Sequence, residues 1–247
     1  MAALIDGVEQ YINPVNYQLM LGLGAPVDVP LHYLMGQSAA DDKVTYLTPS
    51  LNGLQGGVSY TPEANDEASR SLAGVLADDT EEDFGSSWEA ALRYEGQFND
   101  VTLTLGTGYV HVALEEDVTG AGTDEFDDRR AWNTAAALNY KGFGAGIAYV
   151  TDDNGLRNSD TDILVVGADY TAGPWRLGAS YYDREDELEN LDLGGINIDT
   201  QRYSAGATYT VGGGLELKGS LHHIEHDIAG GSDPEATTLA IGSRLTF

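Results

Sequence analysis

The stretch PWRLGASYYD, residues 174–183, alternates two kinds of side chain. One parity holds Trp175, Leu177, Ala179 and Tyr181, and the other holds Arg176 and Ser180. Alternation with a period of two predicts a β-strand that has one apolar and one polar face. On the apolar face the aromatic rings stand near the two ends of the strand, and small aliphatic side chains stand between them.

The same arrangement recurs along the chain, which predicts an all-β fold. From residue 42 onward, period-2 segments predict strands near 42–48, 53–62, 86–95, 100–113, 130–140, 142–151, 162–171, 174–183, 200–210, 214–226 and 236–247. Rings at strand margins are typical of a barrel whose outer face meets lipid between two aromatic girdles. The predicted girdle residues are Trp88, Tyr94, Trp132, Tyr140, Trp175, Tyr181, Tyr203 and Tyr209. A soluble β-sandwich is the alternative, but it should carry its large side chains at the middle of the strands.

The opposite parity is predicted to be polar or glycine throughout. Six basic residues of the strands fall on this parity: Lys43, Arg93, Arg176, Arg202, Lys218 and Arg244. A charge that faced hydrocarbon near the membrane midplane would cost about 2–4 kcal/mol. A sandwich in water would separate its charges in the same way, so parity supports the barrel without deciding for it.

The connections between strands give a sharper test. Short links alternate strictly with long ones, as in membrane barrels, whose turns are short on one side and whose loops are long on the other. The long links are 63–85, 114–129, 152–161, 184–199 and 227–235, and they contain 27 of the 40 acidic residues. A soluble sandwich has no reason to send its charge to one end, so the links favour the barrel.

Composition excludes several other functions. A net charge of −28 argues against nucleic-acid binding, because phosphates would be repelled over most of the surface. The chain has no cysteine and no serine in an elbow motif, and His111 and His222 are isolated, so catalysis is not expected.

No cofactor and no metal site are predicted. In HHIEH, residues 222–226, neighbouring histidines point to opposite faces of a strand, and His222 and His226 would lie about 13 Å apart. Loosely bound Ca²⁺ or Mg²⁺ at the acidic loops is the alternative, although neither 78–85 nor 124–128 has the ligand spacing of a calcium loop.

Three segments carry a family resemblance. DKVTYLTPSLNGLQGGVSYTPEA (42–64), TAGPWRLGASYYDRE (171–185) and the final GSRLTF resemble hairpins and the last strand of Gram-negative general diffusion porins of the alphaproteobacterial type. The resemblance implies a transmembrane antiparallel up-and-down β-barrel of sixteen strands, of which about eleven are expected here, in residues 42–247. Residues 1–41 would then be the pore-constriction loop segment, irregular or with a short helix. Met1 is therefore expected to be an internal or artificial start, and the chain a fragment that lacks the first strands.

The resemblance also implies a function without chemistry. It predicts a water-filled channel in the bacterial outer membrane for passive diffusion of small hydrophilic solutes and ions, assembled as a homotrimer among outer-membrane lipid and lipopolysaccharide. Acidic groups of the constriction loop would be Asp6, Glu9 and Asp28, and basic groups of the pore wall would be Arg93, Arg176, Arg202, Lys218 and Arg244. Phe247 would be the assembly signal.

Excess acid predicts a weak preference for cations. An acidic β-rich surface or adhesin-like protein that binds through its long loops is the alternative function.

Overall fold

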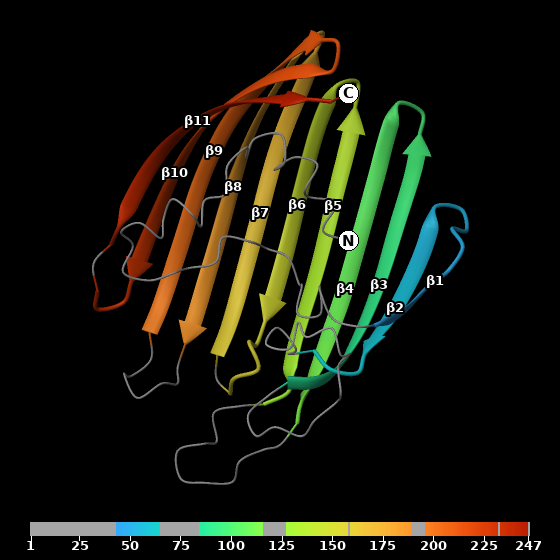
Figure 1. Ribbon diagram of the computed structural model, residues 1–247, viewed down its shortest axis with the longest axis vertical. Coiled ribbons are helices and arrows are strands. Elements are labelled where there is room, and N and C mark those ends of the chain that lie inside the picture. The colour runs from blue at the N-terminus through green and yellow to red at the C-terminus, as the bar shows by residue number, and fades with distance from the viewer. Residues whose placement is uncertain are drawn as a thin grey trace.

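The computed structural model describes residues 43–64, 84–115, 127–157, 159–188, 196–231 and 233–246. These residues form eleven strands in one antiparallel sheet, in which each strand pairs with its neighbours in the sequence (Figure 1). The strands are β1 (Val44–Leu47), β2 (Leu54–Thr61), β3 (Phe84–Phe98), β4 (Val101–Leu114), β5 (Arg129–Tyr140), β6 (Phe143–Asp152), β7 (Ser159–Ala172), β8 (Trp175–Leu188), β9 (Ile196–Gly212), β10 (Leu215–Ile228) and β11 (Glu235–Leu245). The prediction of an all-β, up-and-down fold is confirmed, and β1 and β11 are the two edges of a sheet that is not closed.

All eleven predicted strands are present, but several are longer than predicted. The pairing of β8 with β9 continues to Leu188 and Ile196, inside the predicted link 184–199. Polar side chains had suggested a loop there. They do not prevent pairing, because the backbone ladder is independent of which side chains it carries. Among the described residues no helix is long and apolar enough to cross a membrane.

The short links lie together at one end of the sheet, which we call the turn end, and the long links lie at the other, the loop end (Figure 1). The turns at Asn52–Gly53 and Lys141–Gly142 have positive φ at both residues, as two-residue hairpins of type I′ require. The β9–β10 turn also has positive φ angles, at Gly213 and Gly214. These turns fix the register of the hairpins, and hence the face on which each side chain lies.

The two faces of the sheet are inverted with respect to a soluble protein. The parity that holds the predicted girdle, here called the apolar face, is exposed: Trp88 is 58% and Ile241 is 83% accessible. The other parity, here called the polar face, contains buried side chains such as Arg202 and Thr200. A wall that meets lipid on its apolar face accounts for this inversion, since lipid tails are as apolar as the side chains that face them.

The polar face is not polar throughout, so that prediction was wrong. Near the loop end, β6, β7, β8 and β10 place a buried hydrophobic cluster on it, which consists of Ala148, Val150, Ile163, Val165, Tyr182 and Ile224. A smaller cluster contains Val110, Val112 and Ala131. The continuous apolar run Ile163–Val166 in β7 places apolar side chains on both faces of the sheet. This is the sequence pattern of a strand that is covered on both sides.

The turn end provides a first test. Gly214 has φ +82°, and a Cβ there would lie 2.0 Å from the carbonyl oxygen of Thr246. We expect Gly214→Ala to lower the free energy of unfolding in urea by about 2 kcal/mol, because the left-handed conformation and the displaced carbonyl both cost energy. Gly213→Asn is the control, since Gly213 has no atom within 4 Å of the corresponding position and Asn tolerates its φ of +61°. Equal losses in the two variants would contradict this account of the turn.

Candidate functional site

All eight predicted girdle aromatics lie on the apolar face, and together with further rings they form two rows. The row near the loop end contains the ring pairs Tyr60–Trp88, Trp132–Tyr149 and Tyr181–Tyr203, with centroids 4.5, 6.1 and 5.1 Å apart. The row near the turn end contains Phe143–Tyr170 and Trp175–Tyr209, at 4.2 and 4.7 Å. From Trp175 to Tyr181 the strand covers about 20 Å, which approaches the ~25 Å height of the apolar band of a membrane barrel. That the rows lie at the two interfaces stays a prediction.

Polar groups stand directly beyond the loop-end row on the same face. Tyr149 donates a hydrogen bond to Asp162 at 2.7 Å, and Tyr181 donates one to Asp183 at 2.8 Å. Tyr203 donates one to Gln201 at 3.0 Å. The tyrosines therefore lie between an apolar band and an acidic margin. This arrangement is expected of an amphipathic ring, whose apolar body is buried and whose hydroxyl group reaches polar surroundings.

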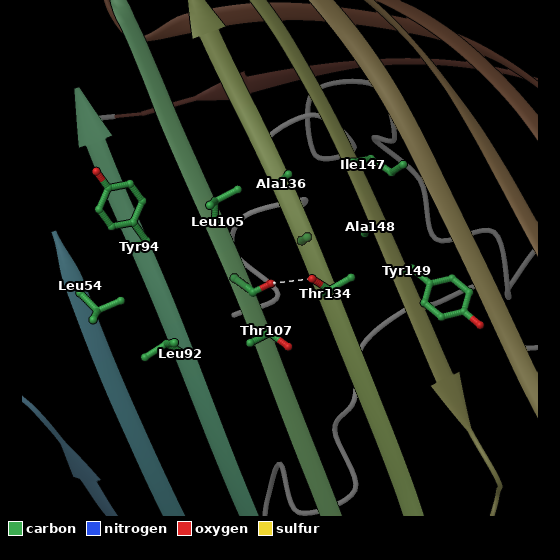
Figure 2. Close-up of a pocket in the computed structure, with 12 residues that line it drawn as sticks. Leu54, Leu92, Tyr94, Leu105, Thr107, Thr134, Ala136, Ile147, Ala148 and Tyr149 are labelled. Carbon is green, nitrogen blue, oxygen red and sulfur yellow. Dashed lines mark hydrogen bonds between the residues drawn. The ribbon is translucent and has the colours of Figure 1, made fainter. Parts of the chain in front are cut away.

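Between the rows, the apolar face of β2–β6 is hollowed. Figure 2 shows the side chains that line this hollow of about 390 Å³, which come from adjacent strands and include Leu54, Leu92, Leu105 and Ile147. At its centre stand small residues, among them Thr107, Thr134 and Ala136. Thr134 donates its hydroxyl proton to the Gly106 carbonyl at 3.3 Å, so this hydroxyl is bonded within the wall. The hollow is part of the apolar band.

The predicted basic residues of the pore wall all lie on the polar face, but they do not form one basic stripe. Arg176 makes two hydrogen bonds to Asp169, at 2.9 and 3.0 Å, and Lys218 lies 3.7 Å from Glu216. Arg93 pairs with Glu95 on the same face, in β3, nearer the β1 edge of the sheet.

The remaining two basic residues differ from each other in exposure. Arg202 is 1% exposed, and its guanidinium lies 4.9 Å from the centroid of the Tyr182 ring. Arg244 is exposed near the turn end, directly opposite Glu216 on the neighbouring strand. These contacts balance much of the positive charge of this wall within the wall itself.

Sequence reasoning missed two further ion pairs on the polar face. Arg184 donates two hydrogen bonds of 2.7 Å to Asp186, which also accepts one of 2.6 Å from Thr161. Arg129 makes two hydrogen bonds to Asp152, at 2.9 and 2.7 Å. Both pairs fall in segments that were predicted to be links. Residues 184–187 are all charged, so no alternation of apolar and polar side chains marked the strand there.

The link between β6 and β7 uses acids as acceptors rather than as free charge. Asp153 accepts hydrogen bonds from the backbone N–H groups of Arg130 and Gly155, at 2.7 and 3.1 Å. Burial nevertheless raises the pKa of Asp153 above its ordinary value, because these bonds only partly compensate the lost water. The predicted loop acids Asp6, Glu9 and Asp28, the segment 1–41 and the terminal Phe247 lie outside the described residues.

This geometry defines a class of protein: a β-sheet wall of a membrane, with lipid on its apolar face and polar side chains on the other. The profile of the Gram-negative porin family matches residues 5–229, and the chain belongs to this family. Its location is accordingly the Gram-negative outer membrane. No curated protein matches the chain.

Solved structures agree in fold. An anion-selective porin from Comamonas acidovorans superposes with a TM-score of 0.58 and 14% identity, over 84% of this chain and 60% of that one. A porin refined at 1.8 Å gives 0.55 and 17%, over 83% and 60%. The outer membrane channel DcaP of Acinetobacter baumannii gives 0.57 and 11%, over 83% and 62%. The chain therefore spans about three fifths of the length of these proteins.

The buried ion pair of β8 provides a second test. The side chains of Arg184 and Asp186 are 11% and 6% exposed. Asp186→Asn is expected to lower the free energy of unfolding by about 3 kcal/mol, since it leaves a buried guanidinium without its carboxylate. Glu95→Gln is the matched control, because its pair with Arg93 is about half exposed, and exposed pairs contribute at most about 1 kcal/mol. If both variants unfold at the same urea concentration, the buried pair does not have this role.

Proposed function

We propose that the protein contributes to a water-filled pore of the outer membrane, through which small hydrophilic solutes and ions diffuse passively. The observation that carries this proposal is the inversion of the sheet, with Trp88 and Ile241 exposed on one face and charged groups such as Arg202 and Asp186 buried on the other. A wall of this kind separates hydrocarbon from a polar interior. Membership of the porin family supports the same function.

A weak preference for cations is part of the proposal. Acidic residues number 40 and basic residues 12, which gives a negative field around the pore mouth. The contacts that Arg93, Arg176 and Lys218 make with carboxylates of the same face support this sign, because paired bases attract anions less. The Comamonas acidovorans protein is named as anion-selective, but a similarity at 14% identity concerns the fold alone.

Assembly as a homotrimer, in contact with outer-membrane lipid and lipopolysaccharide, belongs to the same proposal. The exposed apolar face supports it, since this face needs either lipid or a neighbouring copy against it. We assign no reaction to the protein, because the polar face acts by its shape and charge and not through a reacting group.

Planar-bilayer recording tests both the pore function and the sign of the ion selectivity. The protein purified from outer membranes in detergent should give discrete, ohmic conductance steps, and a KCl gradient should give a reversal potential of the cation-preferring sign. Arg244→Gln should shift the reversal potential further toward cations, because it removes an exposed positive charge from the polar face.

The control is Arg130→Gln. It removes another exposed positive charge, at the loop end of β5 and on the parity of the apolar face, and should leave the reversal potential unchanged. Absence of conductance steps would contradict the pore function. A reversal potential that indicates anion preference would contradict the proposed cation preference.

A further inference from the structure

The loop end of β7–β11 carries an arrangement of charge that the pore function does not explain. On the apolar-face parity, beyond the aromatic row, carboxylates stand directly opposite one another on neighbouring strands. The opposed pairs are Asp162 with Glu185, Glu185 with Asp199, Asp199 with Asp227, and Glu225 with Glu235. Like charges in such positions destabilise a sheet.

Basic side chains of the same strands do not relieve this repulsion on that face. Within the described parts of β7–β11, the lysine and arginine residues are all on the polar-face parity, and they are Arg176, Arg184, Arg202, Lys218 and Arg244. The acidic margin is therefore a surface that attracts cations from outside the wall.

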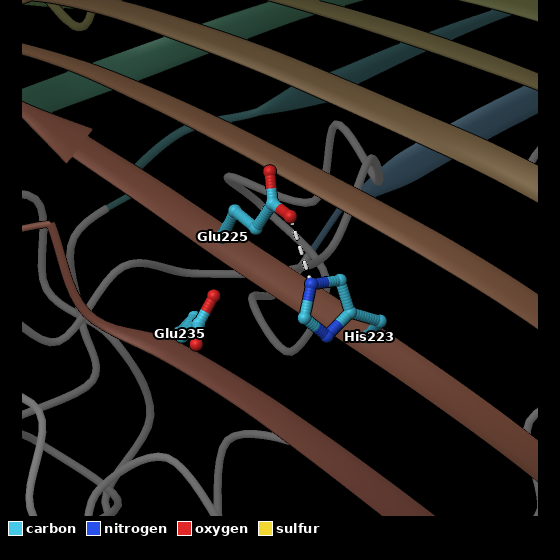
Figure 3. Close-up of side chains that lie close together, drawn as sticks. All are labelled: His223, Glu225 and Glu235. Carbon is cyan, nitrogen blue, oxygen red and sulfur yellow. Dashed lines mark hydrogen bonds and ion pairs between the residues drawn. The ribbon is translucent and has the colours of Figure 1, made fainter.

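At the β10–β11 edge the margin contains a different kind of donor. His223 and Glu225 are two residues apart in β10 and so share a face, and strand pairing brings Glu235 of β11 opposite Glu225. Figure 3 shows the three side chains converging, and one ligand atom from each lies within 4.8 Å of the others. His223 Nε2 is 2.8 Å from a carboxylate oxygen of Glu225.

A second contact fixes the orientation of the imidazole. His223 Nδ1 lies 2.8 Å from the hydroxyl oxygen of Thr237, which stands directly opposite His223 in β11. Nε2 is thereby turned toward Glu225. A histidine that ligates a metal through one ring nitrogen usually has the other nitrogen held in this manner. The arrangement therefore has both the ligands and the support that a metal site needs.

We propose that His223, Glu225 and Glu235 form a binding site for a divalent transition metal ion of the Zn²⁺ class. Zn²⁺ lies about 2.0–2.2 Å from nitrogen and oxygen ligands. Three such ligands of a tetrahedral ion are roughly 3.4 Å from one another by that geometry. Opening the His223–Glu225 contact slightly and moving Glu235 inward would reach this spacing. Water fills the fourth position.

The nitrogen ligand gives the site its selectivity. Ca²⁺ and Mg²⁺ prefer oxygen ligands, whereas imidazole favours Zn²⁺ and its neighbours. Next to the site, a polar recess of about 440 Å³ is lined by Asp199, Asp227 and Asp233 and shares Glu225 and Glu235 with it. These acids raise the local concentration of any divalent cation. His226 also lines the recess, but its Nδ1 lies 2.8 Å from the Thr200 hydroxyl oxygen. Among the described residues, His223 is the histidine grouped with two carboxylates at ligating distance. The bound ion would link β10 to β11 at the loop end.

Calorimetric titration of the detergent-purified, EDTA-treated protein with ZnCl₂ tests the proposal. Glu235→Gln and His223→Gln should each weaken one equivalent of Zn²⁺ binding by at least tenfold, because each removes a ligand. Asp227→Asn is the matched control: it removes the same charge as Glu235→Gln from the same face, two residues from Glu225, and should change the affinity less than threefold. A hundredfold excess of Ca²⁺ should not displace the ion.

Four results would overturn the proposal. If Asp227→Asn weakens binding as much as Glu235→Gln, or if Ca²⁺ displaces Zn²⁺, the margin attracts cations by charge alone. If His223→Gln leaves the Zn²⁺ affinity unchanged, the imidazole is not a ligand and the margin again attracts cations by charge alone. X-ray absorption at the Zn edge of the unmodified protein gives a check that needs no variant, since it should show one imidazole in the first shell. A first shell of oxygen only would exclude His223 as a ligand.

Discussion

The structure depends on one constraint: inside a membrane the backbone N–H and C=O groups can be satisfied only by each other. The sheet meets it by pairing every strand with its sequence neighbours, from β1 to β11, with register irregularities at Phe84/Ser87 and Leu215/Glu216. A slip of one residue in any pair would turn apolar side chains to the polar face and charged ones to lipid. The tight turns fix the register of the hairpins. Gly53, Gly142 and Gly214 allow these turns, since each has a positive φ and a Cβ there would collide with a neighbouring carbonyl oxygen.

Once the register is set, the two faces have opposite demands. The apolar face needs only to match lipid, so its centre tolerates small residues and even the hydroxyl of Thr134, which is bonded to Gly106. The polar face has to compensate each buried charge, and it does so locally, as Arg184 with Asp186 and Arg129 with Asp152 show. In the acidic margin beyond the rings, the described parts of β7–β11 place no lysine or arginine on the same face. This unbalanced charge is one of the grounds for the metal site proposed at His223, Glu225 and Glu235.

The sequence was sufficient to predict the fold, because the two-residue period of the strands and the alternation of short and long links can both be read from a single sequence. It was not sufficient for strand ends: Arg184 and Asp186 look like loop residues until their cross-strand partners are known. The cluster Ile163, Val165 and Tyr182 was missed for a related reason, since Leu164 and Val166 fill the other parity of the same strand. Glu235 could not be assigned to His223 and Glu225 from spacing, because only the pairing of β10 with β11 brings the three together.

The central claim is that the apolar face meets hydrocarbon, and the three tryptophans of the chain test it directly. Trp88, Trp132 and Trp175 all lie on this face and are 58%, 40% and 49% exposed. Their fluorescence should be measured in proteoliposomes with brominated lipid and, separately, with aqueous iodide. The account predicts strong quenching by the lipid and little by iodide. Strong quenching by iodide with none by brominated lipid would show that this face is in water, and would contradict the account.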